Sequence, residues 1–345
     1  YMGGGFGNKN QNQDADLVAA TLSRRSGAPV MLEFSRREDW LGVHGRWPTV
    51  QYYKVGVKDD GTVTAMQMRA YSGMGPYRKN SGGISGMDGY ACPNRYREIN
   101  PVYTNRTTSG NFRAPSEPHG FYGVESMMDE VAYKLGMDPV EFTLKNMRRP
   151  TEDRPFTNYS LDEVIETGAR QFNWQARRRV TPGSDEGPIK RGAGFSFMMF
   201  RSGLGTSSAI VRVNANEEYT LFVGVTDIGP GAKTTMGMIA AEALGVPLSQ
   251  VEVVSGDTDR CPYSVGESGS RTTIMTGYAV VQAAENLKQQ IVSRGMPAGR
   301  DVLIGSATPI PSTDGKTRQC FGAHFVEVEV DSRVGSTRIL KYTTV

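Results

Sequence analysis

The spacing of apolar residues along the first half of the chain predicts alternating helices and strands. Two runs of alternating apolar and polar residues flank Asp59-Asp60-Gly61, a pattern typical of a hairpin. Farther along, apolar residues recur every three to four positions up to Gly136, as expected of a helix that stops at a glycine. The predicted elements are a helix over 14–22, a strand over 29–39, a hairpin over 50–72, a helix over 117–135 and a helix from the Asp138 cap to residue 147.

The second half repeats this mixture after a polar, proline-containing segment that follows residue 150. Ser160 followed by Glu163 has the spacing of a capped helix start. Segment 295–320 carries few periodic signals, and we expect a surface loop there. The predicted elements are a helix over 160–172, strands over 209–215, 218–228 and 251–257, helices over 234–244 and 271–293, and a hairpin over 321–345. We therefore expect an α+β fold of two mixed α/β domains, over residues 1–150 and 151–345.

Composition limits the partners that this chain can have. Its 345 residues, 38% hydrophobic and 22% charged, are typical of a globular protein with more than one domain. The net charge is only +3 and the basic residues are scattered, so nucleic acid is not an expected partner. No apolar run reaches membrane-spanning length and no targeting segment is visible, so we expect no membrane contact. Because Tyr1 lies in an apparent loop, we expect a processed subunit or a fragment.

Cysteine and histidine residues are few. Cys92, Cys261 and Cys320 are far apart, which argues against an iron–sulfur cluster or a disulfide framework within the chain and favours a cytoplasmic location. The three histidines have no metal-ligand spacing. We expect no direct metal ligand from this chain.

Four glycine-rich or polar loops do suggest a ligand. The chain opens with "YMGGGFGNKN", and three later stretches, "SGNFRAPSEPHGF", "TDIGPGAKTT" and "YSVGESGSRTT", lead into predicted helices. Helix N-termini carry unpaired N–H groups and partial positive charge, so each loop could hold an anion. One such loop alone is an ordinary helix cap. Four in one chain favour a shared polyanionic ligand.

In this order, "GGGFGNK", "NFRAPSEPHGFYGVESMMDEVAYKLGMDPVEFTLKNM", "TDIGPG" and "GESGSRTT" resemble the molybdenum-binding subunit of the xanthine dehydrogenase / aldehyde oxidase family. The resemblance covers nearly the whole chain. It implies two domains that hold molybdenum with molybdopterin, as a mononucleotide or a dinucleotide. It also implies partner chains that carry 2Fe-2S clusters and FAD.

The resemblance assigns candidate residues by position. Gly4, Gly5, Phe6 and Gly7 match the family's loop beside the molybdenum, and Arg113 matches a backbone contact near it. The candidate cofactor-binding residues are Gly4, Gly5, Phe6, Gly7, Arg113, Ala114, Gly229, Gly231, Ser268, Gly269, Ser270 and Arg271. Asn10 and Pro115 fall where purine hydroxylases place substrate-contacting residues of other types, which argues against a purine substrate.

Other departures bear on activity. Pro230 replaces the glutamine of the family's Gly-Gln-Gly, and no cysteine occupies the 111–114 loop as it does in carbon monoxide dehydrogenases. The family's general-base glutamate belongs to a segment beyond Val345, and Glu267 is a poor substitute. We expect an aldehyde or an N-heteroaromatic compound as the small-molecule substrate, and a sister chain or segment that carries the missing ends. A catalytically silent homologue, an alternative-reaction homologue and a non-enzymatic binder of another phosphorylated ligand remain open.

Overall fold

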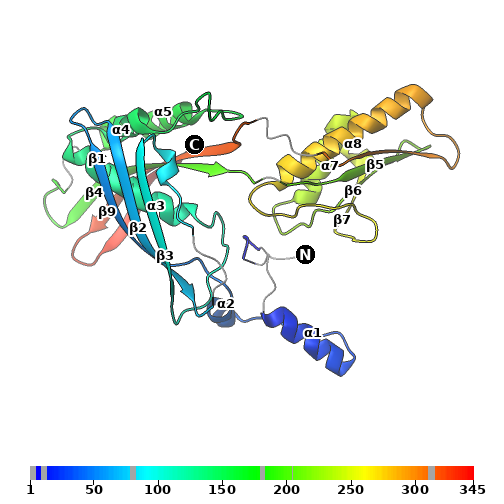
Figure 1. Ribbon diagram of the computed structural model, residues 1–345, viewed down its shortest axis with the longest axis horizontal. Coiled ribbons are helices and arrows are strands. Elements are labelled where there is room, and N and C mark those ends of the chain that lie inside the picture. Colours follow the sequence, from blue (N-terminus) through cyan, green and yellow to red (C-terminus); the bar gives the residue numbers. More distant parts are fainter. Residues whose placement is uncertain (1–4, 9–13, 78–82, 179–182, 204, 310–314) are drawn as a thin grey trace. The chain divides into compact units, whose positions relative to one another are not determined.

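The computed structural model describes residues 5–8, 14–77, 83–178, 183–203, 205–309 and 315–345 (Figure 1). The chain forms two compact units. The smaller unit comprises residues 1–12 and 202–314, and the larger unit comprises residues 13–201 and 315–345. Neither unit ends at residue 150, where the sequence predicts a domain boundary. A strand that precedes residues 202–314 in the sequence pairs with a strand that follows them, and both of these strands belong to the larger unit. The division into domains 1–150 and 151–345 stays a prediction.

The larger unit contains two three-stranded sheets. In the first sheet, β1 (Thr49–Val57) and β2 (Val63–Gly75) form the predicted antiparallel hairpin, and β3 (Asn94–Tyr103) adds in parallel to β2. In the second sheet, β9 (Gln319–Asp331) lies between β10 (Ser336–Thr344) and β4 (Ile189–Arg201), with both pairings antiparallel. The hairpin predicted over 321–345 is therefore confirmed, and β3 and β4 are additions.

Helix α3 (Glu117–Lys134) contacts β1 of the first sheet and β4 of the second. It brings both sheets into one hydrophobic core, which includes Met68, Val124 and Phe325. Helix α5 (Leu161–Phe172) covers β9 and β10, and at Gly168 an added Cβ would lie 2.4 Å from Phe325 Cε2. The short helices are η1 (Met87–Gly89), α4 (Pro139–Asn146) and α6 (Trp174–Arg177). This shared core explains why the larger unit extends beyond residue 150.

Several predicted helix ends are confirmed. The Asp138 carboxylate accepts a hydrogen bond from Val140 N at 2.8 Å and so caps α4. Gly136 follows α3 with a φ of 68°, a left-handed conformation that favours glycine. Ser160 precedes α5 as predicted, but its side chain makes no capping hydrogen bond. Helix α1 (Asp14–Ser26) extends farther than the predicted 14–22.

The strand predicted over 29–39 is wrong. Residues 29–35 pair with no other strand, and residues Arg36–Gly42 form helix α2. The Ser35 hydroxyl accepts from Glu38 N, and the Glu38 carboxylate accepts from Ser35 N at 2.8 Å. This reciprocal capping box is a local helix-start signal. It competes successfully with the preceding apolar run, whose Met31 side chain is 86% exposed and contributes little to a core.

The smaller unit is a four-stranded sheet with two helices on one face (Figure 1). The strand order is β7 (Val251–Ser255), β6 (Tyr219–Val223), β5 (Ala209–Asn214) and β8 (Val302–Ala307). Helices α7 (Ala232–Leu244) and α8 (Thr272–Arg294) pack against the sheet and each other, and η2 (Leu248–Gln250) precedes β7. These helices and the first three strands confirm the predictions.

Strand β8 corrects the loop predicted over 295–320. It pairs with β5, and its single fully buried position is Gly305. A Cβ at Gly305 would lie 2.2 Å from Ala283 O, so the glycine allows α8 to approach the strand. Because β8 is short and contains a glycine, its own residues give a weak strand pattern. In the described part of the chain, no helix combines the length and apolarity needed to cross a membrane.

Candidate functional site

In the smaller unit, the topology brings two of the predicted ligand loops to one edge of the sheet. Strands β6 and β7 are parallel, and each is followed by a helix that returns along the sheet, first α7 and then α8. The loops that start the two helices therefore share the carboxyl edge of these strands, where α/β sheets usually bind ligands. The hydrogen bond from Thr226 N to Glu267 Oε1, 3.1 Å long, joins the two loops directly.

The loop before α8 has a backbone suited to an anion. Gly269 and Ser270 are consecutive left-handed residues, with φ values of 65° and 55°. Their amides make no hydrogen bond within the described residues of the chain. Residues 269 and 270 lie in a turn, and successive N–H groups in a turn can form a concave anion site. Ser270 adopts the left-handed conformation at a cost of about 1–2 kcal/mol, because it has a Cβ. That strain is typical of functional loops.

Arg271 shapes this loop from within. Its Nη2 donates to Val265 O at 2.7 Å, so the guanidinium binds a carbonyl of its own loop. On the other side, Gly203 N donates to Gly269 O at 2.7 Å. A Cβ on Gly269 would lie 3.7 Å from Gly203 Cα, an ordinary van der Waals distance, so the described chain leaves room for it. The structure therefore favours a positioning role for the Arg271 side chain, with Ser268, Gly269 and Ser270 forming the backbone of the candidate ligand loop.

The loop before α7 differs, because it already holds a negative charge. Asp227 Oδ1 accepts from Gly229 N at 3.0 Å and from Gly231 N at 3.1 Å. These backbone hydrogen bonds lower the pKa of Asp227 below its ordinary value. Sequence reasoning missed this residue, although the Asp-x-Gly-x-Gly spacing contains the signal. A phosphate at α7 would meet the Asp227 carboxylate, whereas one at α8 would meet free amides.

The opening glycine-rich stretch also belongs to the smaller unit. Asn8 N donates to Gly5 O at 2.9 Å and closes a turn, in which Phe6 and Gly7 are left-handed with φ values of 50° and 86°. Gly5 is buried, and the Phe6 side chain is 56% exposed. Two of the predicted residues, Gly4 and Asn10, lie outside the described residues.

The remaining predicted residues lie in the larger unit, in the loop before α3. Arg113 and Ala114 are again consecutive residues with positive φ, 26° and 51°. Arg46 donates to three successive carbonyls, those of Arg113 at 2.5 Å, Ala114 at 2.9 Å and Pro115 at 3.2 Å. The amides of Arg113 and Ala114 make no hydrogen bond with the described chain. The two units thus use the same device.

Arg46 is a residue that sequence reasoning missed, because it lies 67 positions from Arg113. Its guanidinium also stacks on Phe112, 5.5 Å from the ring centroid. The other end of the loop is fixed by Ser85, whose hydroxyl lies 2.8 Å from that of Ser116 and whose N–H donates to Ser116 O at 3.1 Å. The loop carbonyls are thereby bound to protein, which leaves its amides for a ligand.

Among the residues that the structure describes, no three His, Cys, Asp or Glu side chains gather closely enough to hold a metal ion.

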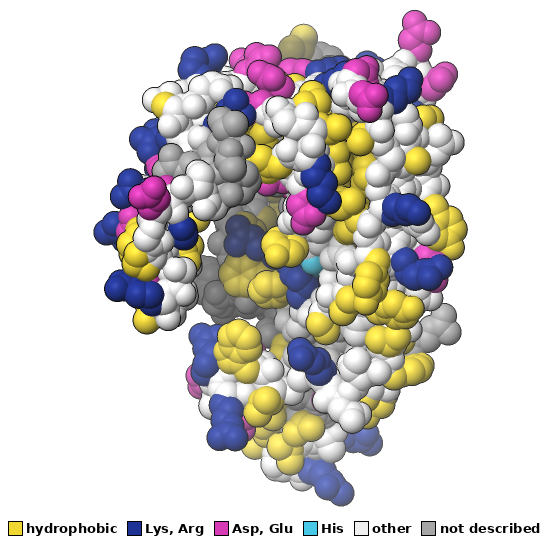
Figure 2. Space-filling model, turned by 90° about the vertical axis from the view of Figure 1, so that its left-hand side faces the viewer, with side chains coloured by type: hydrophobic (Ala, Val, Ile, Leu, Met, Phe, Trp, Pro, Cys, Tyr) yellow, Lys and Arg dark blue, Asp and Glu magenta, His cyan; other side chains and the backbone are white. Residues whose placement is uncertain are grey.

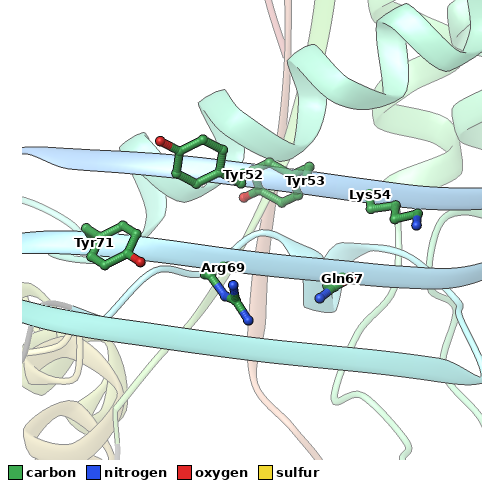
Figure 3. Close-up of a pocket in the computed structure, with 6 residues that line it drawn as sticks. All are labelled: Tyr52, Tyr53, Lys54, Gln67, Arg69 and Tyr71. Atoms are coloured by element: carbon green, nitrogen blue, oxygen red, sulfur yellow. The ribbon is translucent and has the colours of Figure 1, made fainter.

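Figure 3 shows a hollow on the first sheet that is lined by side chains of β1 and β2. Its Arg69 is paired with Glu98 at 3.0 Å, and the pKa of Tyr53 is raised to about 12 by burial. Neither group is poised for acid–base chemistry near neutral pH.

Comparisons with known proteins match both halves of the chain. The family described as "Molybdopterin cofactor-binding domain" matches residues 1–147, and a second family of the same description matches residues 167–299. A putative xanthine dehydrogenase molybdenum-binding subunit of Escherichia coli K12 is 33% identical over 310 residues, which cover 85% of this chain and 41% of that protein. An aldehyde oxidoreductase molybdenum-binding subunit of the same strain is 30% identical and is matched over 51% of its length.

A solved structure supports the same relationship. The aldehyde oxidoreductase of Desulfovibrio gigas superposes with a TM-score of 0.83 at 27% identity, over 99% of this chain and 41% of that one. Like the two sequence relatives, this protein is described as an oxidoreductase or part of one. This chain spans about half, or less, of the length of these relatives.

Proposed function

Because this chain belongs to the family of molybdopterin-binding subunits of xanthine dehydrogenase and aldehyde oxidoreductase, we propose that it holds molybdenum with molybdopterin inside a larger oxidoreductase. The observation that supports this is the repeated backbone device. Gly269-Ser270 and Arg113-Ala114 are both left-handed pairs whose amides have no partner in the described chain. Such amides suit the oxygen atoms and phosphates of a pterin cofactor.

The residues present fit the cofactor as backbone donors rather than as metal ligands. Ser268, Gly269 and Ser270 would hold a phosphate at α8, where no carboxylate competes. Gly229 and Gly231 would contribute less, since their amides already bind Asp227. Phe6 and Gly7 would approach the metal end through their left-handed turn. When bound, the cofactor would supply a metal centre that accepts two electrons from the substrate.

The reaction that we propose is oxidation of an aldehyde or an N-heteroaromatic compound. For an aldehyde, one water is consumed and a carboxylate, three protons and two electrons are released. We propose that the electrons leave through iron–sulfur and FAD partner chains, since Cys92, Cys261 and Cys320 are all free and not clustered. Free cysteines also support a reducing, cytoplasmic location.

Substrate contacts remain a proposal at two positions. Pro115 would lie beside the substrate, because it follows the Arg113-Ala114 pair and its carbonyl is fixed by Arg46. Asn10 would face it from the opening loop. No general base is assigned to the described chain. The Glu267 carboxylate accepts hydrogen bonds from both Thr226 N and the Thr226 hydroxyl, which supports a structural role.

Metal and pterin analysis of the protein purified with its native partners tests this function. We expect near-stoichiometric molybdenum, a fluorescent oxidised pterin and turnover of an aldehyde or N-heterocycle with an artificial electron acceptor. Molybdenum without turnover would support the catalytically silent homologue, for which Pro230 is the supporting observation. Protein with neither molybdenum nor pterin would refute the proposal and leave the binder of another phosphorylated ligand.

A further inference from the structure

The larger unit contains a pocket of about 430 Å³ that none of the predicted cofactor-binding residues line. One wall includes Glu117, the first residue of α3, which directly follows the Arg113–Ser116 loop. Other walls come from η1, the segment after α4, the end of β4 and the start of β9. The pocket thus lies within the larger unit, and its Glu117 wall directly follows a candidate cofactor loop in the sequence. Its volume suits a small organic molecule.

Three arginines give this pocket its charge. Arg148, Arg154 and Arg201 line it, and none forms an ion pair with a carboxylate of the described chain. The pocket's own carboxylates are engaged elsewhere. Asp88 pairs with Arg95 at 3.1 Å, and Glu117 accepts from the Ser116 hydroxyl at 2.9 Å. The pocket therefore holds three arginines against two carboxylates, and one of these, Asp88, also pairs with Arg95 and Arg97 outside the lining.

The cations also affect one another. Burial lowers the pKa of Arg148, and the nearby charges of Arg95 and Arg154 lower it further, whereas the Asp88 carboxylate raises it and only partly offsets them. Both effects disfavour an unaccompanied charge, so an anion in the pocket would be stabilised by several arginines at once. Figure 2 shows the side of the molecule on which β1, β4 and β9 lie in Figure 1, with basic and hydrophobic side chains next to one another.

The other lining residues indicate which further chemical groups the ligand should have. Phe121, Phe156 and Met199 provide apolar surface. Gln319 also lines the pocket, and its side-chain Oε1 is buried without a hydrogen-bond partner. Gln319 lies directly opposite Arg201 in the β4–β9 ladder, so the two side chains lie on the same face of the sheet. A hydrogen-bond donor on the ligand would satisfy this buried acceptor.

We propose that this pocket anchors the substrate through a carboxylate, and that the substrate class is aromatic aldehydes or N-heterocycles that carry a carboxylate and a hydrogen-bond donor. Arg148, Arg154 and Arg201 bind the carboxylate, the phenylalanines contact the ring, and Gln319 accepts from a hydroxyl or ring N–H. The proposal rests on the proposed function, because it treats the neighbouring Arg113–Ser116 loop as part of a cofactor site.

The kinetic test compares a charged with an uncharged aldehyde on the complete enzyme, purified with its partners. The readout is the ratio of kcat/KM for 4-formylbenzoate to that for benzaldehyde. We expect Arg154→Gln and Arg201→Gln each to lower this ratio about tenfold, equivalent to about 1.4 kcal/mol. Both arginines are exposed enough to be replaced without disturbing the core. The control is Arg106→Gln, an exposed arginine that does not line the pocket, which should leave the ratio unchanged.

A binding test separates failure of this proposal from failure of the proposed function. Titration calorimetry of the same complexes with benzoate needs no turnover. Benzoate binding that is weakened by Arg154→Gln but not by Arg106→Gln supports the pocket even if no aldehyde is oxidised. Turnover of benzaldehyde with a ratio that Arg154→Gln and Arg201→Gln both leave unchanged, or benzoate binding that is absent or insensitive to these variants, would overturn it.

A separate comparison tests whether Gln319 accepts a hydrogen bond from the ligand. A hydroxyl added to the probe at a position meta to both other groups, as in 3-formyl-5-hydroxybenzoate, should improve kcat/KM over 3-formylbenzoate by several-fold in the unmodified enzyme. The improvement should disappear in Gln319→Met, which keeps the side-chain volume and removes the acceptor. The same improvement in Gln319→Met would show that Gln319 does not read the hydroxyl, contrary to the proposal.

Discussion

Glu125 is a buried carboxyl group that should make the larger unit less stable as the pH rises. It lies on α3, where its Oε1 bonds the Tyr90 hydroxyl at 2.7 Å and its Oε2 accepts from Phe197 N at 3.1 Å. No cation faces it. Burial raises the pKa of Glu125 to about 8, and the neighbouring Asp129 opposes its ionisation as well. The folded protein therefore holds a proton that the unfolded chain releases near its ordinary value of 4.5.

The direction and ceiling of the effect follow from this difference. Since protonation favours the folded state, the stabilisation is complete below about pH 4.5 and is lost as the pH rises toward 8. Each pH unit in this window costs at most about 1.4 kcal/mol, and the whole window at most about 5 kcal/mol. Asp129, whose pKa is raised to about 6, adds a slope of the same sign at lower pH.

The variant Glu125→Gln isolates the contribution of Glu125. The amide is neutral at every pH, and its oxygen can still accept from Phe197 N while its NH₂ donates to the Tyr90 oxygen. The Tyr90 hydroxyl can then turn to Thr143 Oγ1, which lies 3.5 Å away. We therefore expect the variant to fold, and to be more stable than the natural protein above pH 8.

Urea unfolding followed by tryptophan fluorescence at pH 5.5, 6.5, 7.5 and 8.5 measures this slope. The natural protein should lose unfolding free energy steadily over this series, whereas Glu125→Gln should change little above pH 6.5. The control Glu166→Gln replaces an exposed carboxylate of α5 and should keep the natural slope. Parallel slopes for the natural protein and Glu125→Gln between pH 6.5 and 8.5 would refute the reasoning.

Three other substitutions test the candidate site. Gly269→Ala should lower the molybdenum content severalfold more than the control Gly245→Ala. Both glycines are left-handed and have room for a Cβ, but only Gly269 lies beside the predicted ligand, so equal molybdenum contents would contradict the prediction. Arg46→Met should lower the free energy of unfolding in urea by about 2–3 kcal/mol and reduce the molybdenum content, because three loop carbonyls lose a charged donor. An unchanged molybdenum content would show that this loop does not hold the cofactor. Asp227→Ala should lower the melting temperature of the cofactor-free protein, since α7 loses the acceptor at its N-terminus; an unchanged melting temperature would show that this contact contributes no stability.

Local sequence signals determined most helices and the order of the ligand loops. The Asp138 cap, Gly136 and the 50–72 hairpin depend on residues within a few positions of each other, so the chain specifies them without distant contacts. The same holds for the left-handed Gly231, whose amide donates to Asp227 four positions earlier. Even the missed helix α2 has a local cause, since the Ser35–Glu38 capping box is visible in the sequence.

Only the tertiary structure decided which distant segments share a core. Strands β4 and β9 pair across residues such as Arg191 and Glu329, which are 138 positions apart, and this pairing places the end of the chain in the larger unit. Arg46 reaches the Arg113 loop in the same way, and β8 depends on β5 for its hydrogen bonds. Such contacts depend on complementary surfaces that form only when the chain has folded, so no spacing rule along the sequence can reveal them.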